Sequence, residues 1–322
     1  MIPKHMKCLF AGLALSFAAG AAAQQYPNKP IKIINPWTAA GPAELLARII
    51  AAKISESLGQ PVIVENKPGA GGVIGAAFVA RSAPDGYTIL FSHVGPIAIS
   101  PALMKDLAYD SVKDFAPITQ VSSGPAVLVV RPGIPATTIR ELIAYAKANP
   151  GKLSYGSVGP GSTTHLAGEM LSLMAAVDLL HVPYKGSAPV VTDMMGGQID
   201  MAFLNTGAIL PQIQSGKVRA IAVSTLKRSS VLPELPTLAE TLPGFELNSW
   251  YGMMAPAGTP KEIVTLFYRE CVKALKAPSV IDWLKQNGFD PVGSTPEEHA
   301  AQIRGDLERW AKIVKAAKVT VN

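Results

Sequence analysis

The sequence predicts an α/β fold of two lobes, each a doubly wound, mainly parallel sheet, with a ligand cleft between the lobes. Short β-rich segments alternate with segments of helical periodicity from residue 31 to residue 224, an order typical of parallel sheets flanked by helices. The 322 residues also exceed what one hydrophobic core usually serves. In each half of the chain, a loop of small residues leads from a strand into a helix, and open sheets bind ligands at such loops.

The first lobe shows the β-α-β-α-β order that implies parallel strands. Its first helix repeats apolar residues at helical spacing and stops at Gly59, and a turn at 84–86 leads into its third strand. The expected elements are strand 31–36, helix 43–59, strand 61–66, helix 72–82 and, over 84–92, a turn followed by the third strand.

The second lobe repeats this alternation, and Thr137 or Thr138 is expected to cap its first helix. The expected elements are strand 126–132, helix 137–151, strand 153–157, helix 162–176, strand 179–184, helix 188–197, strand 199–205, helix 208–216 and strand 218–224.

A proline-rich segment at 232–244 and an extended segment at 250–258 follow the second lobe. Two or three helices then close the chain, and we expect them to pack on the first lobe. The chain would cross between the lobes near 116–124 and near 248–255. The predicted domains are a first part of domain 1 at 24–121, domain 2 at 122–250, and a return to domain 1 at 251–322.

The first 23 residues have the order of a secretory signal peptide. Lys4 and Lys7 precede the apolar run 8–20, and Ala21 and Ala23 form an A-x-A cleavage site. The run is short for a membrane anchor, which is the alternative, and no later stretch approaches a spanning helix. The mature chain is therefore expected to begin near Gln24 and to be exported to the periplasm without membrane insertion.

The charge pattern argues against a nucleic-acid partner. The formal charge is +6, and it falls to +4 when the two lysines of the leader are removed, but these charges are dispersed along the chain. A mild positive charge suits anionic small molecules. His165 and His181 have no nearby cluster of Asp and Glu at metal-ligand spacing, so no metal site is expected. Cys271 alone remains in the mature chain, so it forms no internal disulfide and is expected to be buried.

The stretch SYGSVGPGSTTH, residues 154–165, is the most informative loop. It lacks the Gly-Lys-Ser/Thr of a Walker A loop, and its glycines have the wrong spacing for a dinucleotide fingerprint. Neither Ser157 nor Ser162 lies between the two glycines that a nucleophile elbow requires. What remains is a glycine turn ending in N-cap residues whose hydroxyls can hydrogen-bond an anion, with a plain capped helix start as the alternative.

The other candidates follow strand ends in both lobes, where core packing is the alternative for each. A second glycine-rich loop, 69–75, is explained equally well by ligand contact and by close packing of a helix on a strand. The residues expected to bind ligand are Trp37, Thr38, Ala39, Ala40, Gly41, Ser92, His93, Ser157, Gly159, Gly161, Ser162, Thr163, Tyr184 and Asn205.

Several stretches occur together, in this order, across residues 30–260: IKIINPW, GPAELLAR, VIVENKPGAGGVIGA, APDGYTIL, LSYGSVGPGSTTHLAGE, HVPYKGSAP, GGQIDMAF and SWYGMMAPAGTP. This set resembles the substrate-binding proteins of the tripartite tricarboxylate transporters, the Bordetella uptake gene (Bug) family. The resemblance implies a periplasmic binding fold of the second topological type. It also implies a small carboxylate held between the lobes, mostly by backbone amides and bridging waters from the loops at 37–44 and 158–165.

Two positions depart from the pattern of that family. Ala40 stands where the family usually has glycine, and Glu44 stands where it usually has aspartate. Alanine restricts the positive φ that glycine allows, and glutamate has a longer reach, so the grip of the first-lobe loop is expected to differ.

The expected function is a non-enzymatic, monomeric periplasmic receptor that needs no cofactor and delivers a carboxylate to the membrane subunits of a tripartite tricarboxylate-type transporter. One alternative is a periplasmic sensor that presents its closed form to a membrane kinase. A second is a secreted hydrolase using Ser157 or Ser162 with His165 or His181, which the absence of an elbow disfavours.

Overall fold

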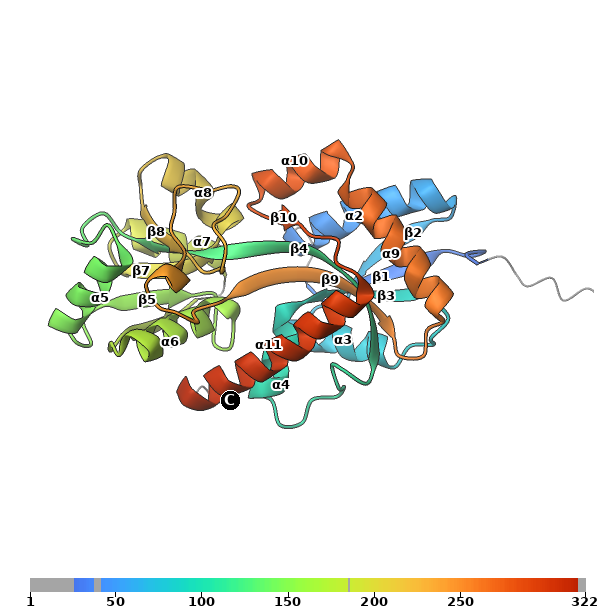
Figure 1. The fold of residues 1–322 in the computed structure, drawn as a ribbon, viewed down its shortest axis with the longest axis horizontal. Coiled ribbons are helices and arrows are strands. Elements are labelled where there is room, and N and C mark those ends of the chain that lie inside the picture. Colours follow the sequence, from blue (N-terminus) through green and yellow to red (C-terminus); the bar gives the residue numbers. More distant parts are fainter. Residues whose placement is uncertain (1–25, 38–41, 185, 318–322) are drawn as a thin grey trace, which may run out of the picture.

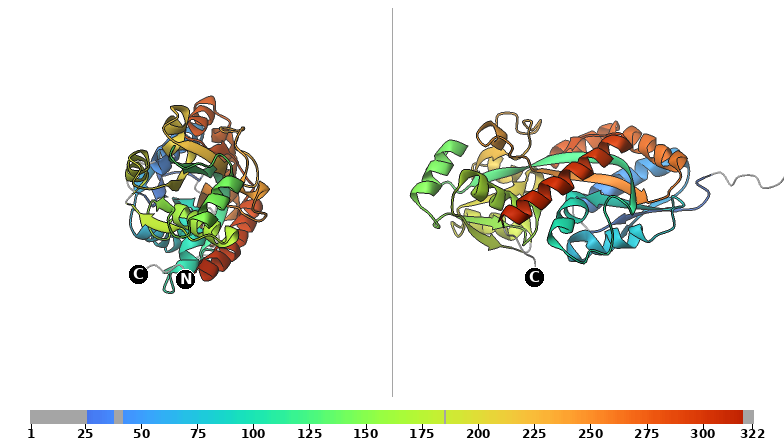
Figure 2. Two further views of the ribbon diagram at one scale, coloured as in Figure 1. Left: turned by 90° about the vertical axis from the view of Figure 1, so that its left-hand side faces the viewer. Right: turned by 60° about the horizontal axis from the view of Figure 1, so that its bottom comes forward.

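A computed structural model describes residues 26–37, 42–184 and 186–317 of the chain. The predicted signal peptide and the candidates Thr38, Ala39, Ala40 and Gly41 lie outside the described residues. The molecule is elongated, with two lobes joined by long strands (Figures 1 and 2). Among the described residues, no helix has the length and apolar character needed to cross a membrane.

One mixed sheet runs through both lobes in the order β2-β1-β3-β9-β4-β7-β5-β6, and β8 and β10 also pair with β4. Strands β1, β2 and β3 are parallel to one another, as are β5, β6 and β7, which agrees with the two doubly wound lobes predicted. The strands are β1 (Ile31–Asn35), β2 (Val62–Asn66), β3 (Thr88–His93), β4 (Phe115–Val130), β5 (Ser154–Ser157), β6 (Leu180–Pro183), β7 (Met201–Asn205), β8 (Arg219–Val223), β9 (Asn248–Pro256) and β10 (Asp290–Pro291).

Helices cover both faces of each half of the sheet. Thr138 caps the first helix of the second lobe through a capping box with Glu141, which decides between the two capping residues predicted. The helices are α2 (Pro42–Leu58), α3 (Val73–Ala80), α4 (Ser100–Leu103), α5 (Ile139–Ala148), α6 (Thr163–Ala175), α7 (Ser187–Met195), α8 (Thr206–Gln214), α9 (Lys261–Leu275), α10 (Pro278–Gln286) and α11 (Pro296–Ala317), with single turns η2 (Ala70–Gly72), η3 (Gly95–Ile99) and η4 (Leu238–Glu240).

Strand β4 is longer than predicted. The sequence reads as a strand only from residue 126, because Pro117, Gly124 and Pro125 are typical strand breakers. In the structure the strand starts at Phe115, and the irregular register near Pro117 accommodates the missing N–H. Strand β9 pairs antiparallel with the first part of β4. The predicted domain boundaries at 121/122 and 250/251 fall within these two continuous strands. The boundaries therefore stay predictions.

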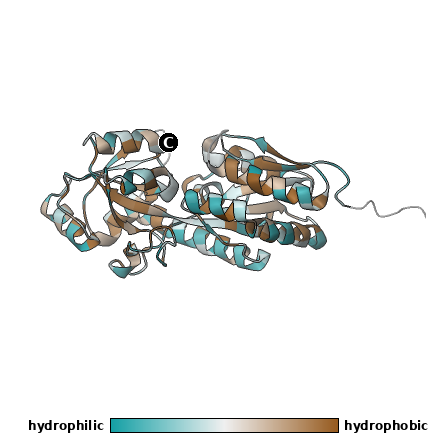
Figure 3. Ribbon diagram, turned by 90° about the horizontal axis from the view of Figure 1, so that it is seen from above, coloured by the Kyte–Doolittle hydropathy of each residue, from teal (hydrophilic) through white to brown (hydrophobic). Residues whose placement is uncertain are grey.

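The core follows the alternation of the strands. Ile31 and Ile33 of β1 face α2 and α9 in one cluster, while Ile34 faces α3 and η3 in another. Buried Cys271 belongs to the first of these clusters, as expected. Figure 3 shows apolar residues concentrated on the central strands and polar residues on the outer helix surfaces.

The last helix differs from the expectation that all closing helices pack on the first lobe. Helices α9 and α10 do pack against α2 of that lobe, but α11 contacts α4 and η3 as well as α6 of the second lobe. Arg309 of α11 also forms a 2.7 Å ion pair with Glu246, which precedes β9. Figure 1 shows α11 lying across the junction of the lobes.

Candidate functional site

The parallel strands of the two lobes end opposite each other on β4. His93, the last residue of β3, pairs with Tyr251 of β9, which pairs with Ser122 of β4. Asn205, the last residue of β7, pairs with Ala126. These positions are four residues apart (126 − 122), or about 13 Å along a strand. Because β3 and β7 run toward each other, the ligand-binding edges of both lobes meet at this stretch.

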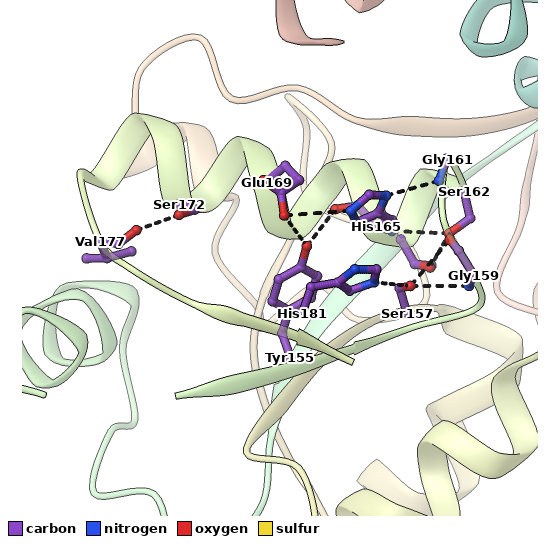
Figure 4. Close-up of polar contacts among 11 residues, drawn as sticks. Tyr155, Ser157, Gly159, Gly161, Ser162, His165, Glu169, Ser172, Val177 and His181 are labelled. Carbon is purple, nitrogen blue, oxygen red and sulfur yellow. Dashed lines mark hydrogen bonds and ion pairs between the residues drawn. The ribbon is translucent and has the colours of Figure 1, made fainter. Parts of the chain in front are cut away.

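The second-lobe loop is held by its own side chains (Figure 4). Ser157 Oγ accepts the Gly159 N–H at 3.2 Å, and His165 Nδ1 accepts the Gly161 N–H at 3.0 Å. Ser162 is the N-cap of α6: its Oγ accepts the His165 N–H and donates to the Gly159 carbonyl. The amides of both glycines are thus used inside the loop, so the glycines shape the turn.

Two amides at the start of α6 remain available. The N–H groups of Thr163 and Thr164 are in the first turn, where a helix offers no internal acceptor. Within the described part of the chain they have no hydrogen-bond partner, whereas the Val158 N–H is taken by Thr164 Oγ1 at 2.9 Å. With the positive end of the helix dipole, these two amides form an anion-accepting position.

Two uncharged histidines, His165 and His181, stabilise this loop. The rings of His165 and His181 stack with centroids 4.0 Å apart, and Ser157 Oγ lies 2.7 Å from His181 Nε2. Burial lowers the pKa of His165, and burial followed by the neighbouring His165 lowers the pKa of His181 to about 4. Both rings are therefore uncharged near neutral pH, and His165 can accept the Gly161 N–H only in that state.

In the first lobe, His93 is fixed at the end of β3. Its Nδ1 accepts the Gly95 N–H at 3.1 Å, so its Nε2 carries the proton and donates to Ser249 Oγ, also at 3.1 Å. The Trp37 ring meets the His93 ring edge-on at 5.5 Å. Burial lowers the pKa of His93 to about 4. The fold thus brings Trp37 and His93 together, and Ser249 of β9, which is distant in the sequence, contacts His93.

The start of the first-lobe loop is held by amide side chains. Asn35 Nδ2 donates to the Trp37 carbonyl at 3.2 Å and to Asn66 Oδ1 at 2.9 Å. Glu44 accepts from Arg48 Nε at 2.7 Å and from Asn66 Nδ2 at 3.2 Å. The glutamate that departs from the family pattern is therefore engaged by a cation and an amide of its own lobe.

Of the remaining candidates, Tyr184 and Asn205 belong to the candidate site, whereas Ser92 does not. Tyr184 donates its hydroxyl proton to Asp193 at 2.8 Å, and Asn205 is half-buried with no partner for its Oδ1 among the described residues. Both lie at strand ends of the second lobe. Ser92 is fully buried, and its Oγ lies beside Gly252, on the side occupied by His299, so we leave it out of the site.

Backbone conformation and packing together explain the glycines of the loop 69–75: Gly69, Gly71 and Gly72 have positive φ, and Gly75 is closely packed. A Cβ on Gly75 would lie 2.8 Å from Cβ of Pro36 and 2.9 Å from the Lys67 carbonyl. Helix α3 therefore lies directly against the end of β1. The described residues hold no group of three His, Cys, Asp or Glu side chains placed to bind a metal ion.

Ser249 and the amide of Thr164 are not among the residues predicted from the sequence. Ser249 carries no local signal, because only the pairing of β9 with β3 and β4 brings it to His93. Thr164 stands in the recognised loop, and its position as the second residue of α6 is what leaves its amide unpaired.

Comparison with known proteins decides the family. The model of the tripartite tricarboxylate transporter family receptor matches residues 46–319. The chain belongs to this receptor family. BugT of Bordetella pertussis is 38% identical to the receptor, over 92% of each chain.

Two solved structures of relatives from Rhodopseudomonas palustris contain dicarboxylates. Rpa4515 with adipate is 35% identical, with a TM-score of 0.80, and covers 92% of this chain and 99% of its own. MatC with bound malate is 31% identical, with a TM-score of 0.76, and the match covers 90% of this chain and 100% of the MatC chain. The receptor thus has the fold of the periplasmic solute-binding proteins of this transporter class.

Proposed function

We propose that the receptor holds a small carboxylate between its lobes, beside residues 122–126 of β4, and delivers it to the membrane subunits of its transporter. The observation that carries this proposal is the opposition of the strand ends, with Asn205 on one side and His93 on the other. The dicarboxylates bound to the two relatives support a dicarboxylate as the ligand class.

Each group has a distinct task in this proposal. The amides of Thr163 and Thr164 bind one carboxylate group, because they are the unpaired donors at the start of α6. Ser162 and the two glycines at 159 and 161 keep these amides in place. Asn205 and Tyr184 form the second-lobe wall of the site, and Trp37 and His93 form the facing wall. The predicted contacts of residues 38–41 lie outside the described residues and stay predictions.

The remaining expectations belong to the same proposal. The first 23 residues direct export and are removed, and the mature receptor works in the periplasm as a monomer. The lobes correspond to residues 24–121 with 251–322, and to residues 122–250. The ligand contacts both lobes, and these contacts make the closed form more stable when the ligand is present.

The receptor performs no hydrolysis in this proposal, although Ser157 and His181 form a serine–histidine pair. Ser157 is fully buried, and its Oγ also accepts the Gly159 N–H. A nucleophile must be able to reach its substrate, and this hydroxyl is enclosed by its own loop.

Calorimetric titration tests the proposed function. The protein without its leader is titrated with malate, adipate, citrate and acetate, and with adipamide as an uncharged control. We expect saturable binding of at least one dicarboxylate and none of adipamide. A folded protein that binds none of these acids, and that carries no organic acid in native mass spectrometry after mild purification, would contradict the proposal.

A further inference from the structure

Apart from the strands that join them, the two lobes also touch where the start of α8 meets the turn between α10 and β10 (Figure 1). A Cβ built on Gly207 would lie 2.5 Å from the Asn287 carbonyl oxygen, and its three nearest atoms all belong to Asn287. A Cβ built on Gly288 would overlap the Thr206 side chain and lie 3.0 Å from the Gly207 nitrogen. We call these four residues, Thr206, Gly207, Asn287 and Gly288, the glycine seam.

The glycine seam is attached to the stretch of β4 where the strand ends meet. Thr206 Oγ1 donates to the Pro125 carbonyl at 3.2 Å. On the other side, Phe289 lies so close to Gly124 that a Cβ there would be 2.6 Å from the ring. Strand β10 then pairs with residues 122 and 123 of β4. A change in the angle between the lobes therefore has to move the seam.

A polar contact continues the seam outward. Ser230, which follows β8 of the second lobe, donates its hydroxyl proton to Asp290 of β10. Ser230 is exposed, and Asp290 is half-buried. The glycine seam and this polar contact together extend from the edge of the proposed site to the surface of the molecule.

Nothing within the second lobe requires a glycine at position 207. Gly207 is exposed and lies in the first turn of α8, where its φ is not in the left-handed region. Alanine at such a helical position is ordinarily neutral or stabilising. The obstacle to a methyl group comes from Asn287 in the facing lobe.

We propose that the glycine seam is the contact on which the lobes close, and that Gly207 is the residue that permits full closure. The proposal rests on the proposed function only in that the ligand drives closure. A methyl group at 207 would hold the lobes apart at the seam while leaving each lobe intact. Overpacking of a fitted contact weakens the closed state about fivefold to a hundredfold.

Disulfide trapping measures closure without a ligand. The double variant Ser230→Cys, Asp290→Cys places two thiols across the seam, and Cys271 is fully buried and does not interfere. In this background, the crosslinking rate is compared with and without Gly207→Ala. Gly305→Ala is the matched control, because Gly305 is a glycine of α11 with nothing within 4 Å of its Cβ position.

We expect the double variant to crosslink, Gly207→Ala to slow the reaction about fivefold to a hundredfold, and Gly305→Ala to leave the rate unchanged. The melting temperature of Gly207→Ala should equal or exceed that of the parent. Failure of the parent pair to crosslink, or equal rates with and without Gly207→Ala, would overturn the proposal. Gly288→Ala is not used, because Gly288 has a φ of 72° and would be strained in any state.

Adding malate or adipate separates this proposal from the proposed function. Acceleration of crosslinking by either acid supports ligand-driven closure. A rate that neither acid changes, together with a clear effect of Gly207→Ala, would contradict the proposed function while supporting the seam as the closing contact.

Discussion

Ser157 Oγ lies 2.7 Å from His181 Nε2, although the two residues come from neighbouring strands 24 positions apart. The distance is that of a nucleophile and its base, but the two side chains hold the loop 154–165 in its conformation. The same hydroxyl accepts the Gly159 N–H, and the His181 ring stacks on His165, which accepts the Gly161 N–H. Two residues that suggest catalysis thus fix the two glycines before α6.

Replacing Ser157 with alanine should loosen the loop. The change removes the acceptor of the Gly159 N–H and leaves His181 Nε2 unpaired. We expect a loss of about 1–3 kcal/mol in the free energy of unfolding and weaker carboxylate binding. Chemical denaturation and calorimetry measure the two effects. Ester turnover by the wild type that disappears in Ser157→Ala would instead favour a hydrolase.

Replacing Thr163 with proline should weaken ligand binding without unfolding the protein. Proline is well tolerated as the first residue of a helix, and Ser162 already has the extended backbone that precedes proline, with ψ 161°. The variant lacks the Thr163 N–H, so binding of a dicarboxylate should weaken about tenfold or more. Thr163→Ala keeps that N–H and is the control. Equal affinities of the two variants would show that this amide does not hold the carboxylate.

Acid should destabilise the folded protein. Burial lowers the pKa of His93, His181 and His299 to about 4 from an ordinary 6.5, so the unfolded chain binds more protons between these values. Stability therefore falls as the pH drops through this window, by about 1–3 kcal/mol for each of the buried His93 and His299. The loss is smaller for half-buried His181, because water screens its charge.

Asp306 changes the stability of the fold with pH in the direction opposite to that of the histidines. Burial raises its pKa to about 6, so its contribution is present at low pH and is lost as the pH rises through that value. Because three histidines oppose one aspartate, we expect the net stability to decrease on acidification. Urea denaturation at about pH 7 and about pH 5 measures it. Constant stability across this range, or an increase toward acid, would contradict the neutral state of the buried rings.

A methyl group at Gly168 should cost stability despite the helical position. Its Cβ would overlap the ring of Tyr155, which is fully buried beneath α6. We expect Gly168→Ala to lower the free energy of unfolding by about 1–3 kcal/mol, whereas Gly305→Ala, with open space around it, should not. Two variants of equal stability in thermal denaturation would mean that Tyr155 can move aside.

Much of the fold was predictable because burial follows local periodicity. The alternation of Ile33 and Ile34 on opposite faces of β1, and the N-cap at Ser162, can be seen in the sequence. The continuity of β4 was not predictable, because Pro117 and Pro125 are tolerated only through pairing with a distant strand.

The site was predictable to a similar extent. Strand ends and the loop 154–165 are local signals, so the sequence located this region. The use of the Gly161 amide by His165, and the stack of that ring on His181, depend on the parallel register of β5 and β6. Long-range pairing of this kind has no signature in one sequence.

A crystal structure of the receptor with a bound dicarboxylate would show directly where the ligand is held. We expect carboxylate oxygens within about 3 Å of the amide nitrogens of Thr163 and Thr164, with further contacts to the first lobe near Trp37 and His93. A ligand bound elsewhere, such as the groove between α6 and α11 lined by Met170 and Ile313, or held by one lobe alone, would contradict this expectation.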